Sequence, residues 1–157
     1  MMIDEKKPLT RSELEIIIKR RAAVLLIILA ALVAINSFFK DSNSGRIMKD
    51  IIAANNQWAW YQAKNVRSVI YEVANRQSDA DRMKTDMEEI KARAIAFEKE
   101  QKELSVKSPY YTYSAMLMQL GLVLSTAAIL AVSMPLFYSA VAVGSFGVVL
   151  FAIALGV

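Results

Sequence analysis

Two long stretches of this chain contain no charged side chain, and that absence limits the possible folds more than any other feature. Residues 22–39 form an uncharged run of 18, and residues 108–157 form an uncharged run of 50. Every charged residue therefore lies before residue 22 or within 40–107. Charged side chains are costly in the hydrocarbon of a bilayer, so this segregation is typical of membrane spans joined to a water-exposed segment.

The lengths of the two runs predict three spans. At the helical rise, the first run reaches about 27 Å, which is enough to cross the hydrocarbon core once. The second run is long enough for two crossings, with the break at Ser133-Met134-Pro135, because proline suits the start of a helix. We therefore divide the chain into a basic N-terminal segment (1–21), a first transmembrane helix (22–39), a water-exposed segment (40–107), a second transmembrane helix (108–134) and a third (135–157).

The first span has an alternative interpretation as a signal peptide. Lys19, Arg20 and Arg21 resemble a basic signal start, and Ala34 ends an acceptable cleavage sequence. We favour an uncleaved anchor, because the apolar run is longer than a usual signal core and two more spans follow. The basic cluster also favours a cytoplasmic N-terminus, which would place the water-exposed segment on the other side of the membrane.

The side chains of the spans are almost entirely apolar. Tyr110, Tyr111 and Tyr113 precede the second span, and Phe38 and Phe39 end the first, so we expect them to lie at the membrane interface. No ionisable group lies within the spans, which argues against a proton pump or an ion-coupled transporter. The polar residues within the spans are Asn36, Gln119, Ser125, Thr126, Ser139 and Ser145.

Small residues recur four positions apart in the last two spans. Gly121 is followed by Ser125, and Ala140 by Gly144. Such pairs allow membrane helices to approach closely, although they also occur as ordinary membrane-helix composition. The sequence leaves both interpretations open.

The water-exposed segment predicts an antiparallel helical hairpin. DSNSG (41–45) is a cluster of turn-forming residues that should break the helix after the first span. Residues 46–75 contain no proline or glycine, and NRQSDAD (75–81) should form the next turn. Pro109 should end the second helix. The predicted fold class is an all-α membrane protein with three transmembrane helices and a coiled-coil-like extramembrane hairpin between the first two.

Three local patterns refine this hairpin. Ser78 followed by Asp81 resembles a capping box at the start of its second helix. Apolar residues recur at alternating spacings of four and three in each helix, with two amides in the first row and one in the second. We predict that these rows face each other. The first row is Met48, Ile52, Asn55, Ala59, Gln62, Val66, Val69 and Val73, and the second is Met83, Met87, Ile90, Ala94, Phe97, Gln101 and Leu104.

The stretch NNQWAWYQAKNVR (55–67) is unusually rich in aromatic and amide side chains. On a helical projection, an aromatic and basic stripe lies opposite the first row, where it is not needed to close the hairpin. Trp60 and Lys64, and likewise Arg67 and Tyr71, are spaced for cation–π contacts. This stripe is either internal packing or an interface with another subunit, a third helix or anionic headgroups. The candidate interaction residues are Trp58, Trp60, Tyr61, Gln62, Lys64, Arg67 and Tyr71.

The run QWAWYQAKNVR, followed by Tyr71-Glu72, resembles the bacterial membrane-protein family catalogued as domain of unknown function 4337. LGLVLSTAAIL (120–130) and VGSFGVVLFAIALG (143–156) are similar to the paired final spans of that family. The chain departs from the family in having no histidine near its N-terminus and no basic cluster in residues 131–136. The resemblance implies the same three-span architecture in a bacterial inner membrane, and no assigned activity. With the N-terminus in the cytoplasm, the water-exposed segment would then lie in the periplasm. The residues that match its signature are Trp58, Tyr61, Gln62, Ala63, Lys64 and Arg67.

The residue types argue against catalysis. The chain has no histidine and no cysteine, so the usual general base, thiol nucleophile and soft metal ligands are all missing. We predict no catalytic, cofactor or metal site, and the acidic residues within 79–89 are typical of a solvated helix start. Residues 40–107 carry 13 basic and 11 acidic side chains, a net charge of only +2, which argues against nucleic acid as a partner.

Two functions remain compatible with the sequence. The first is a non-enzymatic scaffold or interaction protein in the lipid bilayer, whose hairpin forms a homo-oligomer or docks another membrane-protein subunit. The alternative is a subunit of an oligomeric channel or transporter, because three spans are too few for a pore alone. The second function would need a polar stripe in the spans, and Asn36, Gln119 and Ser125 offer only a thin one.

Overall fold

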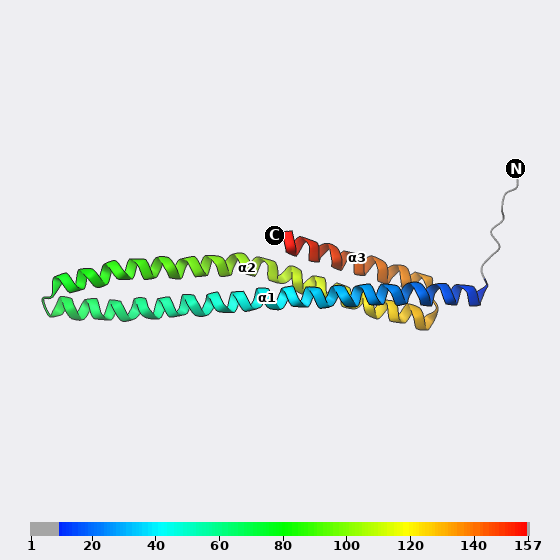
Figure 1. Ribbon diagram of the computed structural model, residues 1–157, viewed down its shortest axis with the longest axis horizontal. Coiled ribbons are helices and arrows are strands. Elements are labelled where there is room, and N and C mark those ends of the chain that lie inside the picture. The colour runs from blue at the N-terminus through cyan, green and yellow to red at the C-terminus, as the bar shows by residue number, and fades with distance from the viewer. Residues whose placement is uncertain (1–9, 157) are drawn as a thin grey trace, which may run out of the picture. The chain divides into compact units, whose positions relative to one another are not determined.

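The computed structural model describes residues 10–156 and consists of three α-helices in that range (Figure 1). They are α1 (Arg11–Val73), α2 (Gln77–Ala131) and α3 (Met134–Gly156). The prediction of an all-helical chain is confirmed. Residues 1–9 of the predicted N-terminal segment and Val157 of the predicted third span lie outside the described residues.

Each of the three helices contains a stretch long and apolar enough to cross a membrane, as predicted. The predicted break before the third of them is also confirmed. The connection between α2 and α3 is Val132-Ser133, and Pro135 is the second residue of α3. The carbonyl of Ser133 accepts from the backbone N–H of Phe137 (3.2 Å), which starts the ladder of α3.

The prediction that DSNSG breaks the first helix is wrong, because α1 runs through residues 41–45 without interruption. Glycine in a helix costs only about 1 kcal/mol relative to alanine, which packing can offset. Asn43 supplies such packing. Its side chain is buried, and its amide donates to the Leu104 carbonyl (3.1 Å) and the Ser108 hydroxyl (3.2 Å) of α2.

Pro109 was predicted to end the second helix, and it lies inside α2 instead. Proline has no N–H to donate to the carbonyl four residues earlier, so it usually ends a helix. It is tolerated where a neighbouring helix satisfies the backbone nearby. The two hydrogen bonds from Asn43 hold the turn that directly precedes Pro109 against α1.

The connection between α1 and α2 is shorter than predicted. Asn75 has a φ of 56°, and the N–H of Arg76 donates to the Tyr71 carbonyl (2.8 Å) while that of Asn75 donates to the Glu72 carbonyl (3.0 Å). This is a Schellman arrangement, with asparagine in the left-handed position that it tolerates better than most residues. The chain reverses in three residues, so the predicted turn at 75–81 is too long.

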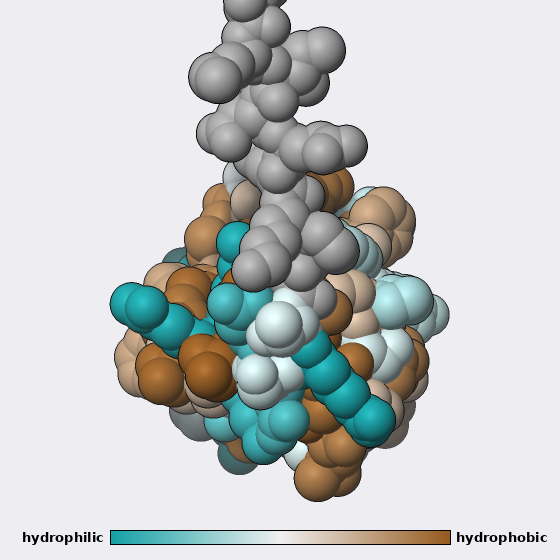
Figure 2. Space-filling model, turned by 90° about the vertical axis from the view of Figure 1, so that its right-hand side faces the viewer, coloured by the Kyte–Doolittle hydropathy of each residue, from teal (hydrophilic) through white to brown (hydrophobic). Residues whose placement is uncertain are grey.

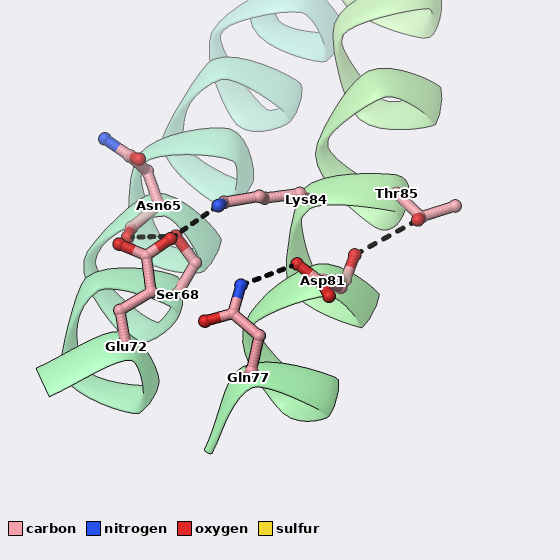
Figure 3. Close-up of polar contacts among 7 residues, drawn as sticks. All are labelled: Asn65, Ser68, Glu72, Gln77, Asp81, Lys84 and Thr85. Carbon is pink, nitrogen blue, oxygen red and sulfur yellow. Dashed lines mark hydrogen bonds and ion pairs between the residues drawn. The ribbon is translucent and has the colours of Figure 1, made fainter. Parts of the chain in front are cut away.

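The predicted capping box at Ser78 is also wrong, because α2 has already begun at Gln77. In its place, the Gln77 amide donates to the Asp81 carboxylate (3.1 Å), and Thr85 donates to the Asp81 carbonyl (3.1 Å; Figure 3). These bonds support the first turns of α2 from within the helix.

The chain divides into two compact units, which we describe separately. One unit contains residues up to 40 together with 109–157, and the other contains residues 41–108. Figure 2 views the molecule from the end where α1 begins and α2 meets α3, and hydrophobic side chains alternate there with polar ones. The exposed residues in this part include Ile16 and Leu130 as well as Arg11.

Close contacts between backbones hold the first unit together. A Cβ on Gly147 of α3 would lie 2.8 Å from the Met118 Cγ and 2.9 Å from the Met118 nitrogen of α2. A Cβ on Gly121 would lie 3.2 Å from the Gly144 Cα, and both glycines contact Leu29 of α1. The small residues of the last two spans therefore serve helix packing, which settles the choice left open by the sequence.

Polar groups and aromatic rings complete this packing. The buried Asn36 amide donates to the Tyr111 carbonyl (3.0 Å), and the Ser114 hydroxyl donates to the Gly147 carbonyl (2.9 Å). The Tyr111 ring packs against Phe151, with the centroids 6.2 Å apart. The Tyr111 ring is buried in this cluster and therefore faces the neighbouring helices, whereas Tyr113 is exposed. That these aromatic residues lie at the membrane interface stays a prediction.

In the second unit, α1 and α2 lie side by side and run in opposite directions (Figure 1). Arg46 pairs with Glu100 (3.1 Å), and Glu72 pairs with Lys84 (2.5 Å) near the connection (Figure 3). The predicted row on α2 does face inward. Its buried members are Met87, Ile90, Ala94 and Leu104, and its half-buried members are Met83, Phe97 and Gln101.

The predicted row on α1 is wrong, because it is the side of the helix that no other part of the unit covers. We call it the outer row: Met48, Ile52, Asn55, Ala59, Gln62, Val66, Val69 and Val73, of which all eight are exposed. The side that faces α2 also has alternating spacings of four and three. We call it the inner row: Asn43, Ile47, Asp50, Ala54, Gln57, Tyr61, Lys64, Ser68 and Tyr71.

Candidate interaction surfaces

The structure divides the seven predicted interaction residues between two sides of α1. Tyr61, Lys64 and Tyr71 belong to the half-buried part of the inner row, and Trp58 lies half-buried beside them. Trp60, Gln62 and Arg67 are exposed. The seven candidate residues therefore do not lie on one surface.

Trp58 joins the two helices. Its indole N–H donates to the Glu98 carboxylate of α2 at 2.7 Å. Its ring meets the Tyr61 ring edge-on, with the centroids 5.7 Å apart. Aromatic pairs in this geometry add to the burial of their own surface, so these two residues stabilise the contact between α1 and α2.

Lys64 makes an ion pair with Asp86 of α2, and only 21% of the Lys64 side chain is exposed. The hydrogen bond from the Lys64 ammonium holds the pKa of Asp86 below its ordinary value, because it stabilises the charged carboxylate. Near the connection, the hydrogen bond to Glu72 raises the pKa of Lys84 for the same reason. These shifts favour the charged forms of Asp86 and Lys84.

The predicted cation–π partners have changed. The guanidinium of Arg76 lies over the Tyr71 ring, 4.9 Å from its centroid. Arg67, the predicted partner of Tyr71, is exposed, and the ammonium of Lys64 pairs with Asp86 in place of Trp60. Arg76 directly follows the asparagine that reverses the chain, so its position depends on a turn that helical spacing does not describe.

The exposed part of the predicted site centres on Trp60, which is 65% exposed. Two shallow hollows flank its indole. One, of about 380 Å³, opens between α1 and α2 beside Asp86, Glu89 and Arg93. The other, of about 350 Å³, is lined by α1 alone, and we call its lining the Trp60 patch: Ala59, Trp60, Ala63, Lys64 and Arg67.

Sequence reasoning missed the polar groups of the inner row. Asp50 is buried, and its Oδ2 has no hydrogen-bond partner among the described residues. Ser68 donates to the Asn65 carbonyl (2.9 Å) within α1. The spacing of the inner row was present in the sequence, but its members are too polar for a search based on apolar residues to detect.

A capping box at the start of α1 was also missed. The backbone N–H of Thr10 donates to the Glu13 carboxylate (2.8 Å), and the N–H of Glu13 lies 3.4 Å from the Thr10 hydroxyl. The spacing of threonine and glutamate is the signal that could have identified it. Bonds from Thr10 hold the pKa of Glu13 below its ordinary value.

The described residues offer no group of three or more acidic, histidine or cysteine side chains that could hold a metal ion. Several acidic residues near the start of α2 are paired with cations. Asp79 pairs with Arg76 (2.6 Å), and Asp86 pairs with Lys64. The arrangement of this region supports contacts between helices, and its chemistry is that of ion pairs and aromatic packing.

Comparisons with known proteins found a family match. The family described as Domain of unknown function (DUF4337) matches residues 18–79 and 72–157. No curated protein and no solved structure matched the chain. Since the two matched segments together cover nearly all of the sequence, the chain belongs to the DUF4337 family.

Proposed function

We propose that the protein is a non-enzymatic scaffold in the bacterial inner membrane that forms an oligomer or docks a partner through residues 41–108. In this proposal the apolar parts of α1 and α2 and the whole of α3 cross the bilayer. Residues 41–108 form a coiled-coil-like hairpin in the aqueous phase on the periplasmic side.

The Trp60 patch is the observation that supports this proposal most directly. The patch combines a tryptophan that is 65% exposed with an exposed Arg67 side chain beside a shallow hollow. Tryptophan and arginine are the residues most enriched in the energetic centres of protein interfaces. The other predicted aromatic residues are already used between α1 and α2, so the patch is available for an external contact.

The charge distribution supports the proposed orientation. Arg20 and Arg21 are exposed at the start of the first apolar stretch, and the positive-inside rule places such residues in the cytoplasm. The alternative function, a channel subunit, has less support. Asn36 and Ser125 are buried among the helices whereas Gln119 is exposed, so these polar residues do not share one surface.

The double substitution Trp60→Ala with Arg67→Ala tests the proposal. We expect it to shift the complex in mild detergent toward lower mass, by weakening association at least about tenfold, as for two residues in an interface centre. The protein should remain helical and membrane-inserted, because neither side chain contributes to the described contacts between α1 and α2. Mass measurement by light scattering, with circular dichroism for helicity, reports both quantities.

The matched control is Ile95→Ala with Lys99→Ala, which removes an exposed apolar and an exposed basic side chain from α2. We expect this variant to keep the original mass. The proposal is wrong if the unmodified protein is monomeric and carries no other protein with it. Equal masses for the Trp60 variant and the control would show that the patch is not the contact.

A further inference from the structure

The outer row gives α1 a second packing face that the chain itself leaves uncovered. Met48 is 57% exposed, Val66 is 59% exposed and Val73 is 82% exposed. The inner row, which contacts α2, lies on the opposite side of the same helix. Each outer-row residue from Met48 to Val69 is two positions before an inner-row residue, which is a rotation of about 200° around the helix. α2 therefore cannot cover both rows.

The outer row has the pattern of a two-stranded coiled coil. It extends over 26 residues, from 48 to 73, or about 39 Å and nearly four heptads. Ile52, Ala59, Val66 and Val73 recur every seven residues in the position called a, and three of these four are β-branched. β-Branched residues at this position favour parallel pairs of helices over larger assemblies.

The flanks of the outer row are almost free of charge. The positions beside it are Ile51, Asn56, Trp58, Ala63, Asn65 and Ile70, with Lys49 and Glu72 only at the two ends. When two identical helices pair in parallel, the residues on one flank of the row in one copy meet the residues on the opposite flank in the other copy. No like charges are brought together along the middle of such a contact, so the face is compatible with itself.

From this geometry we infer that the outer row binds the outer row of a second copy of this chain, in parallel and in register. The inference goes beyond the proposed function, because it assigns a second contact to a side of α1 other than the one that carries Trp60 and Arg67, and it names another copy of the chain as the partner. Two copies of the chain that both follow the positive-inside rule have the same orientation in the membrane, so their α1 helices run in the same direction. Asn55 and Gln62 then meet the same residue of the other copy, and such paired amides fix the register of a coiled coil at some cost in stability.

The absence of cysteine from the natural chain allows a direct test by disulfide crosslinking. Single substitutions Val66→Cys and Val69→Cys place a thiol in the outer row. Ile95→Cys and Val106→Cys place one on α2 at nearly the same exposure (50% for Val69 against 49% for Ile95). The full-length variants are oxidised in native membranes with copper phenanthroline, and the dimer fraction is measured by non-reducing electrophoresis.

We expect the two outer-row variants to form disulfide-linked dimers at least about tenfold faster than the α2 variants, because a disulfide requires Cα atoms within about 7 Å. Equal rates for all four variants would overturn the inference, since they would report random collision. Crosslinking of Val66→Cys to a different protein through a bifunctional maleimide would also overturn it, while leaving the proposed docking function intact. A monomer without any partner would contradict both.

Discussion

Gly147→Leu is expected to separate α3 from α2 and to destabilise the unit formed by residues 10–40 and 109–156 by about 2–3 kcal/mol, at the upper end of the usual cost of overpacking a close contact. The reason is that even a single added carbon would lie 2.9 Å from the backbone nitrogen of Met118 and 3.1 Å from the carbonyl oxygen of Ser114. Backbone atoms cannot rotate away as a flexible side chain can. The hydrogen bond from Ser114 to the Gly147 carbonyl (2.9 Å) would be lost as the helices part.

The control for this variant is Gly156→Leu, which makes the same substitution in the same helix. A Cβ at Gly156 meets no other atom within 4 Å, so this variant should unfold at the original midpoint. The measurement is unfolding of the purified protein by sodium dodecyl sulfate in mixed micelles, followed by circular dichroism and by protease sensitivity. Identical midpoints for the two variants would contradict the described contact between α2 and α3.

The second large effect is expected for Ala94→Asp in the inward-facing row of α2. Ala94 is fully buried in the unit formed by residues 41–108. A carboxylate at this position would lose its water without gaining a designed partner, which costs several kcal/mol for a buried charge. We expect α1 and α2 to separate between residues 41 and 108, and trypsin to cleave there at least about tenfold faster, since local opening governs proteolysis.

Ala92→Asp provides the matched control, because Ala92 is exposed on the same helix two residues away. This variant should resist trypsin as the unmodified protein does. Neither substitution introduces a new cleavage site, so the two digests can be compared directly. Equal cleavage of both variants would mean that Ala94 does not face α1.

Hydrophobic spacing predicted the row on α2 but failed on α1. The α2 row is mostly Met, Ile, Ala, Phe and Leu, so apolar periodicity identified the buried side correctly. On α1 the apolar residues lie in the outer row, whereas the inner row contains Asn43, Asp50 and Lys64. Hydropathy alone selects the more apolar of two rows, and here ion pairs and hydrogen bonds to α2 decide which one faces inward.

The helix boundaries show a second limit of local reasoning. The turn-forming residues of 41–45 and Pro109 predicted two breaks, and neither occurs. Asn43 contacts residues 61 and 65 positions further along the chain, and no local rule describes a bond of that range. By contrast, the break before Pro135 was predicted correctly, because no residue there opposes the preference of proline for a helix start.

The sequence identified the residues of the candidate site but not which of them contact α2. The aromatic and basic residues around Trp60 were recognised as unusual, yet the sequence could not show which of them α2 would use. Trp58 bonds to Glu98, 40 residues further along the chain, and Lys64 pairs with Asp86, 22 residues further along. Trp60 and Arg67 stay exposed. A helical projection of α1 alone contains no information about these partners.

Cysteine labelling of intact spheroplasts tests most directly the claim that residues 22–39 lie in lipid while residues 41–108 lie in water. The variants are Lys99→Cys, which is exposed on α2, and Ile27→Cys, which is exposed on the apolar part of α1. The account predicts that a membrane-impermeant maleimide labels the Lys99 variant and leaves the Ile27 variant unlabelled until detergent is added. Equal labelling of both without detergent would contradict it.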